Sequence, residues 1–150
     1  MQLKKSHLGA GALALGAVLA FAVPAGAAVN LQSESGGAPA IKIVKQAQLK
    51  AKGAATVVTV NVTCPAGSEY SLYVTVTQTV SGSSTTNGSG SLDRQTCTGA
   101  TEKVKVHVAV AGGGAPFKKG DAYAVGNADV YGPWGYTSLQ TGRVIVNVES

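Results

Sequence analysis

Strict alternation of β-branched and polar residues is the feature that most constrains how this chain folds. Between residues 58 and 64 the order is Val58, Thr59, Val60, Asn61, Val62, Thr63, Cys64. Because successive side chains of a strand point to opposite faces, a period of two predicts a strand with one buried face. Valine and threonine also lose rotamer freedom in a helix, so composition and period lead to the same prediction.

The same period recurs along most of the chain after residue 40. It predicts strands over 41–52, 58–64, 72–80, 92–97, 103–110, 122–130 and 138–148. The first segment is rich in Gln, Lys, Ala and Leu, which also favour a helix, but its alternation favours a strand. The polar stretch 81–91 contains Asn87-Gly88, a strong signal for a hairpin turn. Gln78 falls on the apolar side of its strand and indicates a strand end or a bulge.

The spacing of these segments predicts the fold class. About seven strands joined by Gly, Pro, Ser and Asn, with no convincing helix, indicate an all-β protein. We expect an antiparallel β-sandwich with strands packed in two sheets. A small closed barrel is the alternative.

The first 27 residues have the organisation of a secretory signal peptide. Lys4 and Lys5 form a positive start, residues 8–23 carry no charge, and Ala25-Gly26-Ala27 matches a small-residue cleavage site. The apolar run is shorter than the roughly 20 residues of a membrane-spanning helix. The sequence therefore predicts a secreted, extracellular protein with no stable membrane insertion after cleavage.

The remainder of the chain is long enough for one ordinary domain. Residues 28–40 are rich in Ser, Gly and Ala and are expected to form a flexible leader, and residues 41–150 a single domain. The formal net charge of the full chain is +5, and the basic residues are spread, with no run longer than Lys118-Lys119. Nucleic-acid binding proteins usually carry a basic stripe on one face, so no nucleic-acid partner is expected.

The two cysteines, Cys64 and Cys97, are predicted to form one disulfide. Export places them in an oxidising compartment, and Cys64 is in phase with the buried valines. A metal site or a catalytic thiol is the rival interpretation, but it lacks companion residues. The chain has no C-x-x-C motif, and His107 is the only histidine after the signal peptide. We therefore expect no metal and no cofactor.

Catalytic residues are not apparent either. Acyl transfer needs a nucleophile, a base and an orienting group within reach. His107 is the only base candidate, and it lies between lysines on the outward parity with no G-x-S-x-G motif before it. Most carboxylates fall in predicted turns, and Asp129 is on an outward face. The sequence predicts a protein that is not an enzyme and has no catalytic residues.

One motif stands out as a candidate binding surface. Tyr131-Gly132-Pro133-Trp134-Gly135-Tyr136 places three aromatic residues, including the only tryptophan, in a turn bracketed by Gly and Pro. Aromatic side chains on a rigid turn offer a large contact area at small entropic cost. Tyr131, Trp134 and Tyr136 are therefore candidate ligand-binding residues for an extracellular polysaccharide or protein. The alternative is that Trp134 folds back and caps one end of the sandwich.

A second surface suggests a different function. The loop from Gly112 to Lys119 begins with three glycines and contains Phe117, which is expected to pack beneath it. Small exported disulfide-bonded domains can present a rigid loop to an enzyme cleft. The alternative hypothesis is therefore an inhibitor of a secreted hydrolase, with Lys118 or Lys119 entering the cleft.

Three segments carry a resemblance to known proteins. They are AQLKAKGAATVVTVNVTCPAG (residues 47–67), CTGA (97–100) and APFKKGDAYA (115–124). With these segments the chain resembles small exported proteins of actinobacteria, most of which have no assigned activity. The resemblance implies an immunoglobulin-like β-sandwich. True immunoglobulin domains space their cysteines more widely and place a tryptophan between them, whereas Trp134 follows both cysteines here, so only the architecture carries over.

Overall fold

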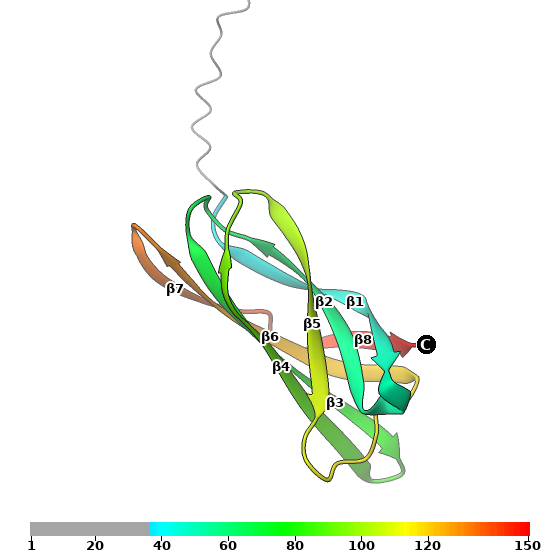
Figure 1. Ribbon diagram of the computed structural model, residues 1–150. Coiled ribbons are helices and arrows are strands. Elements are labelled where there is room, and N and C mark those ends of the chain that lie inside the picture. Colours follow the sequence, from blue (N-terminus) through cyan, green and yellow to red (C-terminus); the bar gives the residue numbers. More distant parts are fainter. Residues whose placement is uncertain (1–36) are drawn as a thin grey trace, which may run out of the picture. The chain divides into compact units, whose positions relative to one another are not determined.

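The computed structural model describes residues 37–150, in which all regular structure is β apart from one 3-10 turn, Ala51–Gly53 (Figure 1). The strands are β1 (Ala40–Lys50), β2 (Ala55–Thr63), β3 (Glu69–Ser81), β4 (Ser84–Thr96), β5 (Thr101–Val110), β6 (Gly120–Gly132), β7 (Gly135–Gln140) and β8 (Val144–Glu149). The expected signal peptide (1–27) and most of the expected leader (28–40) lie outside the described residues. Within the described part, no helix is long and apolar enough to cross a membrane.

The strands form a closed ring rather than two separate sheets. The order of hydrogen-bonded neighbours is β3-β4-β5-β2-β1-β8-β6, and the ring closes because β6 also pairs with β3. β1 makes the closure possible, because it pairs antiparallel with β2 along one edge and parallel with β8 along the other. The all-β prediction is confirmed, and the arrangement is the closed barrel that the sequence left as the alternative to a sandwich.

The long strand β6 positions the candidate site. One of its edges pairs with β3 from Tyr123 to Tyr131. Its other edge is shared, because β8 pairs with Gly120–Ala124 and β7 pairs with Asn127–Gly132. The expected single last strand (138–148) is therefore two strands, which separate at Thr141, where the backbone N–H donates to the carbonyl of Gly126 at 2.9 Å.

The predicted hairpin turn at Asn87-Gly88 is wrong. Both residues lie inside β4, and the turn between β3 and β4 is formed by Gly82 and Ser83. The glycines of β4 serve a different purpose, because a Cβ atom on Gly88 or Gly90 would overlap a backbone carbonyl oxygen of β5. These glycines allow β4 to approach β5 where the two strands pair. This pairing is the shortest in the ring, with only two residue pairs in register.

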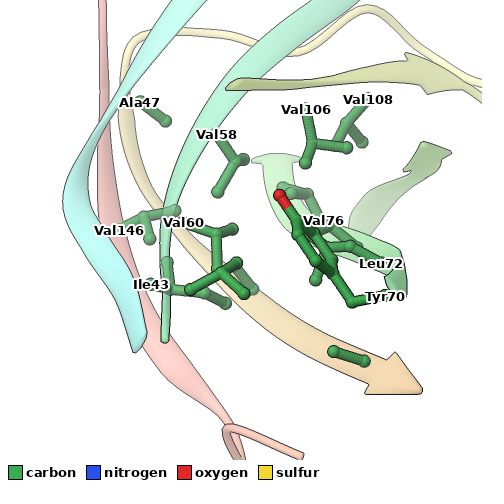
Figure 2. Close-up of a cluster of buried hydrophobic side chains, with 14 of the residues drawn as sticks. Ile43, Ala47, Val58, Val60, Tyr70, Leu72, Val76, Val106, Val108 and Val146 are labelled. Carbon is green, nitrogen blue, oxygen red and sulfur yellow. The ribbon is translucent and has the colours of Figure 1, made fainter. Parts of the chain in front are cut away.

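The predicted alternation builds the core. The inward residues of the strands are almost all valine, leucine or alanine, and they form one buried cluster. Figure 2 shows side chains from β2, β3 and β5 meeting inside the ring, among them Val58, Val60, Tyr70, Leu72, Val106 and Val108. Segment 41–52 is a strand as expected up to Lys50. Its register with β2 shifts between Ile43 and Ala47, and both of these residues are buried.

The predicted disulfide is confirmed. Cys64 follows β2, Cys97 precedes β5, and their Cα atoms are 5.6 Å apart. The backbone around the bridge is also paired, because the N–H of Cys97 donates to the carbonyl of Ser68 at 2.8 Å. A loop closed across 33 residues is expected to stabilise the fold by about 3 to 4 kcal/mol in the chain-entropy model.

Candidate ligand-binding face

The predicted aromatic turn is the tip of the β6–β7 hairpin. Tyr131 pairs with Tyr136 and Gly132 with Gly135, so that Pro133 and Trp134 are the two turn residues. Gly135 has a φ of +120°, a conformation that L side chains rarely adopt. The turn is thus defined by residues of restricted or special backbone geometry, and it holds three aromatic side chains in place.

Trp134 does not cap the barrel. Its side chain is 80% exposed, the largest exposed fraction among the large apolar side chains of residues 37–150, and Tyr131 and Tyr136 are about half exposed. The capping interpretation is therefore wrong, because a side chain that is 80% exposed does not cover the core. The ring centroids of Tyr131 and Tyr136 are 5.3 Å apart with an interplanar angle of 47°, a separation typical of an attractive aromatic pair.

A hydrogen bond orients the ring of Tyr136. Its hydroxyl donates to Oδ1 of Asp129 at 2.7 Å. This bond is the largest cause of a Tyr136 pKa that lies above the ordinary tyrosine value; a hydrogen bond with Ser138 opposes it, and burial and the nearby Asp129 and Tyr131 raise the pKa by smaller amounts. The phenol of Tyr136 therefore keeps its proton to a higher pH than a free tyrosine side chain does.

The aromatic turn is one end of a larger face that the sequence analysis missed. Within residues 37–150 the exposed large apolar side chains are Tyr73, Tyr123, Tyr131, Trp134, Tyr136 and Ile145. Apart from Trp134 at the tip, they all lie on the outer side of β3, β6, β7 and β8. We call this surface the aromatic face.

The strand register shows that these residues share one side. Across β3 and β6, Glu69 pairs with Tyr131, Tyr73 with Asn127, and Thr77 with Tyr123. Side chains directly opposite each other in an antiparallel pair lie on the same side of the sheet. Tyr123 also pairs with Ile145 of β8, which extends the face across a third strand.

Hydrogen-bonding groups separate the aromatic residues. Ser71 pairs with Asp129, which pairs with Ser138. In the next outward row, Tyr73 and Gln140 flank Asn127. The aromatic face therefore alternates apolar rings with hydroxyl, amide and carboxylate groups rather than forming one continuous apolar patch.

A pocket lies at the end of the aromatic face opposite the turn. It has a volume of about 220 Å³ and is lined by Thr77, Thr79, Asp121, Ala122, Tyr123 and Ile145. The side chain of Asn147 donates to Oδ1 of Asp121 at 3.1 Å. The guanidinium carbon of Arg143 is 5.6 Å from the centroid of the Tyr123 ring, within range of a cation–π contact.

The loop from Gly112 to Lys119 is held by the buried side chain of Gln78. Gln78 is 2% exposed; it accepts from the N–H of Lys118 at 2.8 Å and donates to the carbonyl of Lys118 at 2.8 Å. The expectation that Gln78 marks a strand end or a bulge is therefore wrong, because Gln78 pairs with Thr86 inside β3 and the register shift comes later, between Thr79 and Ser81. Phe117 packs beneath the loop as predicted, and Nζ of Lys118 donates to the carbonyl of Val80 at 3.1 Å.

His107 lies in the middle of β5, exposed, as the alternation predicted. In the part of the chain that the structure describes, no group of three or more His, Cys, Asp or Glu side chains is placed to hold a metal ion.

Sequence reasoning found the turn but not the rest of the aromatic face. Tyr73 and Tyr123 both occupy outward positions in their strands, and this parity was visible in the sequence. Their proximity was not, because it depends on the pairing of β3 with β6, some fifty residues apart in the chain.

Comparison of the chain with protein-family models, with curated proteins and with solved structures finds no match.

Proposed function

We propose that this protein is a secreted, non-catalytic module that binds an extracellular polysaccharide through Tyr131, Trp134 and Tyr136. The observation that carries the proposal is the 80% exposure of Trp134 at the tip of a rigid hairpin. An exposed indole ring has no stabilising role in the core, and its hydration is unfavourable. A tryptophan held in this position is best explained by a ligand that covers it.

The composition of the face favours a glycan over a protein partner. A sugar ring offers apolar C–H faces, which stack on aromatic rings, and equatorial hydroxyls, which hydrogen-bond to carboxylates and amides. The aromatic face offers both kinds of group side by side in Tyr131, Tyr136 and Asp129. The core of a protein interface is depleted of charged residues, whereas Asp129, Asp121 and Glu69 all lie on this face.

The charges also favour a neutral glycan. The three carboxylates of the face would repel an anionic polymer. Arg94 lies 4.0 Å from Glu69, and Arg143 lies over the ring of Tyr123. The lysines of β1 and β5 lie on a different side of the ring, where Lys42 and Lys103 flank Asn61 of β2. An uncharged polysaccharide therefore fits the aromatic face better than a sulfated or uronic-acid polymer.

Two further points belong to this proposal. Export is supported by the disulfide, which persists in oxidising compartments. An immunoglobulin-like origin of the ring is supported by its strand neighbours. β1, β2 and β5 are hydrogen-bonded neighbours in that order, and so are β4, β3 and β6. The strands named A, B and E, and those named C′, C and F, are neighbours in the same way in immunoglobulin sandwiches.

The proposal is tested with the purified protein from residue 28 and insoluble peptidoglycan, chitin and cellulose. We expect retention on at least one of these and a saturable change in tryptophan fluorescence with its soluble fragments. Because Trp134 is the only tryptophan, the signal reports on the turn alone. Trp134→Ala should abolish retention, while Lys105→Ala, an exposed change on β5, should not. No retention and no fluorescence change on any of the three would refute glycan binding.

A second candidate function is inhibition of a secreted hydrolase by the loop from Gly112 to Lys119. The observation that favours it is the fixation of the loop by Gln78 and Phe117, because a preorganised loop binds with less entropic cost. Lys118 is engaged with Val80, so Lys119 is the better cleft-seeking side chain. Inhibition across a panel of serine and metalloproteases, lost in Lys119→Ala, tests this function.

A further inference from the structure

We propose that the glycan site continues from the aromatic turn along β3 and β6 to the pocket at Tyr123, and that the ligand is a single polysaccharide chain bound lengthwise. This inference rests on the proposed glycan binding at the turn and extends it to a second subsite. It assigns binding roles to Tyr73, Tyr123 and Ile145, which lie outside the turn.

The first argument is the even placement of apolar contacts along the strand pair. Tyr131 and Tyr123 are at the two ends of the run of β6 that pairs with β3, and Tyr73 lies opposite Asn127, midway between them. At about 3.3 Å per residue, neighbouring positions are about 13 Å apart along β6 and the three span about 26 Å in total. That span is longer than a single terminal sugar ring and corresponds to the length of a chain of several sugar rings.

The second argument is the chemistry of the far pocket. It combines the exposed ring of Tyr123 and the apolar side chain of Ile145 with the hydroxyls of Thr77 and Thr79 and the carboxylate of Asp121. Asn147 holds one oxygen of that carboxylate, which fixes its orientation. The pocket therefore has the same kinds of group as the turn: an apolar surface beside hydrogen-bonding groups of fixed orientation.

The third argument concerns the form of the polysaccharide. The planes of the Tyr131 and Tyr136 rings differ by 47°, and strands twist progressively along their length. Rings that are not coplanar cannot all lie on the flat face of a crystalline fibre. A single chain in solution or in an amorphous matrix can turn along its axis and meet each ring in succession.

The experiment is a length series of soluble oligosaccharides of the polymer that the protein retains, from the disaccharide to the octasaccharide. Affinity is measured by calorimetry and by Trp134 fluorescence. We expect the octasaccharide to bind at least about tenfold more tightly than the disaccharide, because the second subsite binds at a high effective concentration once the first is filled. Tyr123→Ala should remove this gain and leave the affinity for the disaccharide unchanged.

Controls separate the two subsites from effects on folding. Ile145→Ala is the second variant at the far pocket and should act in the same direction as Tyr123→Ala. Lys105→Ala on β5 should change neither affinity, and the thermal unfolding of all variants should remain cooperative. Trp134→Ala should weaken binding of every oligosaccharide.

Different results overturn different parts of the argument. Equal affinities for the disaccharide and the octasaccharide would refute the extended site and leave binding at the turn intact. Retention on crystalline powder without binding of any soluble oligosaccharide would refute the single-chain ligand. A complete lack of binding to both forms would refute the proposed function itself.

Discussion

The hydroxyl of Tyr136 donates a hydrogen bond to Oδ1 of Asp129 across the β6–β7 hairpin, at 2.7 Å. This bond links the aromatic turn to the polar row behind it. It restricts the rotation of the Tyr136 ring, which also contacts Tyr131. The candidate site is therefore organised before any ligand arrives, which lowers the entropic cost of binding.

Replacing Asp129 with asparagine should lower the pKa of Tyr136. The hydrogen bond to the carboxylate is the largest cause of the raised pKa, and an amide cannot repel a phenolate. A titration of tyrosinate absorbance should show one tyrosine ionising at lower pH in Asp129→Asn than in the parent protein. Asp121→Asn, which alters a carboxylate bonded to Asn147 instead, should leave the tyrosine titration unchanged.

Trp134→Ala should leave the fold intact. Because the side chain is 80% exposed, we expect the free energy of unfolding to change by less than about 0.5 kcal/mol. Urea denaturation followed by circular dichroism measures this. A loss of about 3 kcal/mol or more, typical of removing a buried aromatic side chain, would show that the ring stabilises the barrel after all.

Gln78→Leu should destabilise the protein and release the 112–119 loop. The substitution leaves the N–H and carbonyl of Lys118 without their partner, and each such loss costs about 1 to 3 kcal/mol. Denaturant unfolding should show the decrease, and amide hydrogen exchange at Lys118 should accelerate. Gln95→Leu, at an exposed position of β4, serves as the control and should stay within about 0.5 kcal/mol of the parent.

Gly90→Ala should be far more costly than Gly112→Ala. A Cβ atom at position 90 would overlap the carbonyl oxygen of His107, whereas at position 112 it meets no atom within 4 Å. Forcing β4 away from β5 should lower the free energy of unfolding by about 2 kcal/mol or more. Equal stabilities of the two variants would mean that the seam between β4 and β5 is looser than its close approach indicates.

Tyr70 should contribute to the loss of stability at high pH. Burial raises its pKa, with a smaller effect from Glu102, so the folded state holds the phenolic proton more tightly than the unfolded state. The stabilisation from Tyr70 is therefore complete below the ordinary tyrosine pKa of about 10 and is lost as the pH rises through the folded value. Unfolding free energies measured on both sides of that pKa should fall less steeply in Tyr70→Phe than in the parent.

Local patterns predicted the strands and the disulfide well, for physical reasons. Val58 to Cys64 alternate because one face of β2 is buried, and the parity of Cys64 placed its sulfur on that face. Gln78 and Gly88 misled the local reading because their roles depend on distant backbone, the loop at Lys118 and the carbonyl of Ala109. When a residue's role is a contact with a segment far away in the chain, the local sequence pattern does not indicate that role.

The sequence left ring closure as an alternative and did not indicate the aromatic face, both for the same reason. The parallel pairing of β1 with β8 and the second pairing of β3 with β6 join segments whose individual patterns fit a sandwich equally well. Tyr73 and Tyr123 were each visible as outward residues, but only the β3–β6 register brings them to one face. The sequence likewise indicated Trp134 as notable and left open whether it faced the core or the solvent.

The parallel pairing of β1 with β8 has a consequence for how the protein responds to pulling. Gln46 lies beside Asn147 and Gln48 beside Glu149, with both strands running the same way. Tension that draws the start of β1 and the end of β8 apart acts along these strands and loads all hydrogen bonds between them at once, in shear. Rupture then requires several bonds to break together instead of one after another. A chain pulled from both ends would thereby resist mechanical extension at this pair of strands.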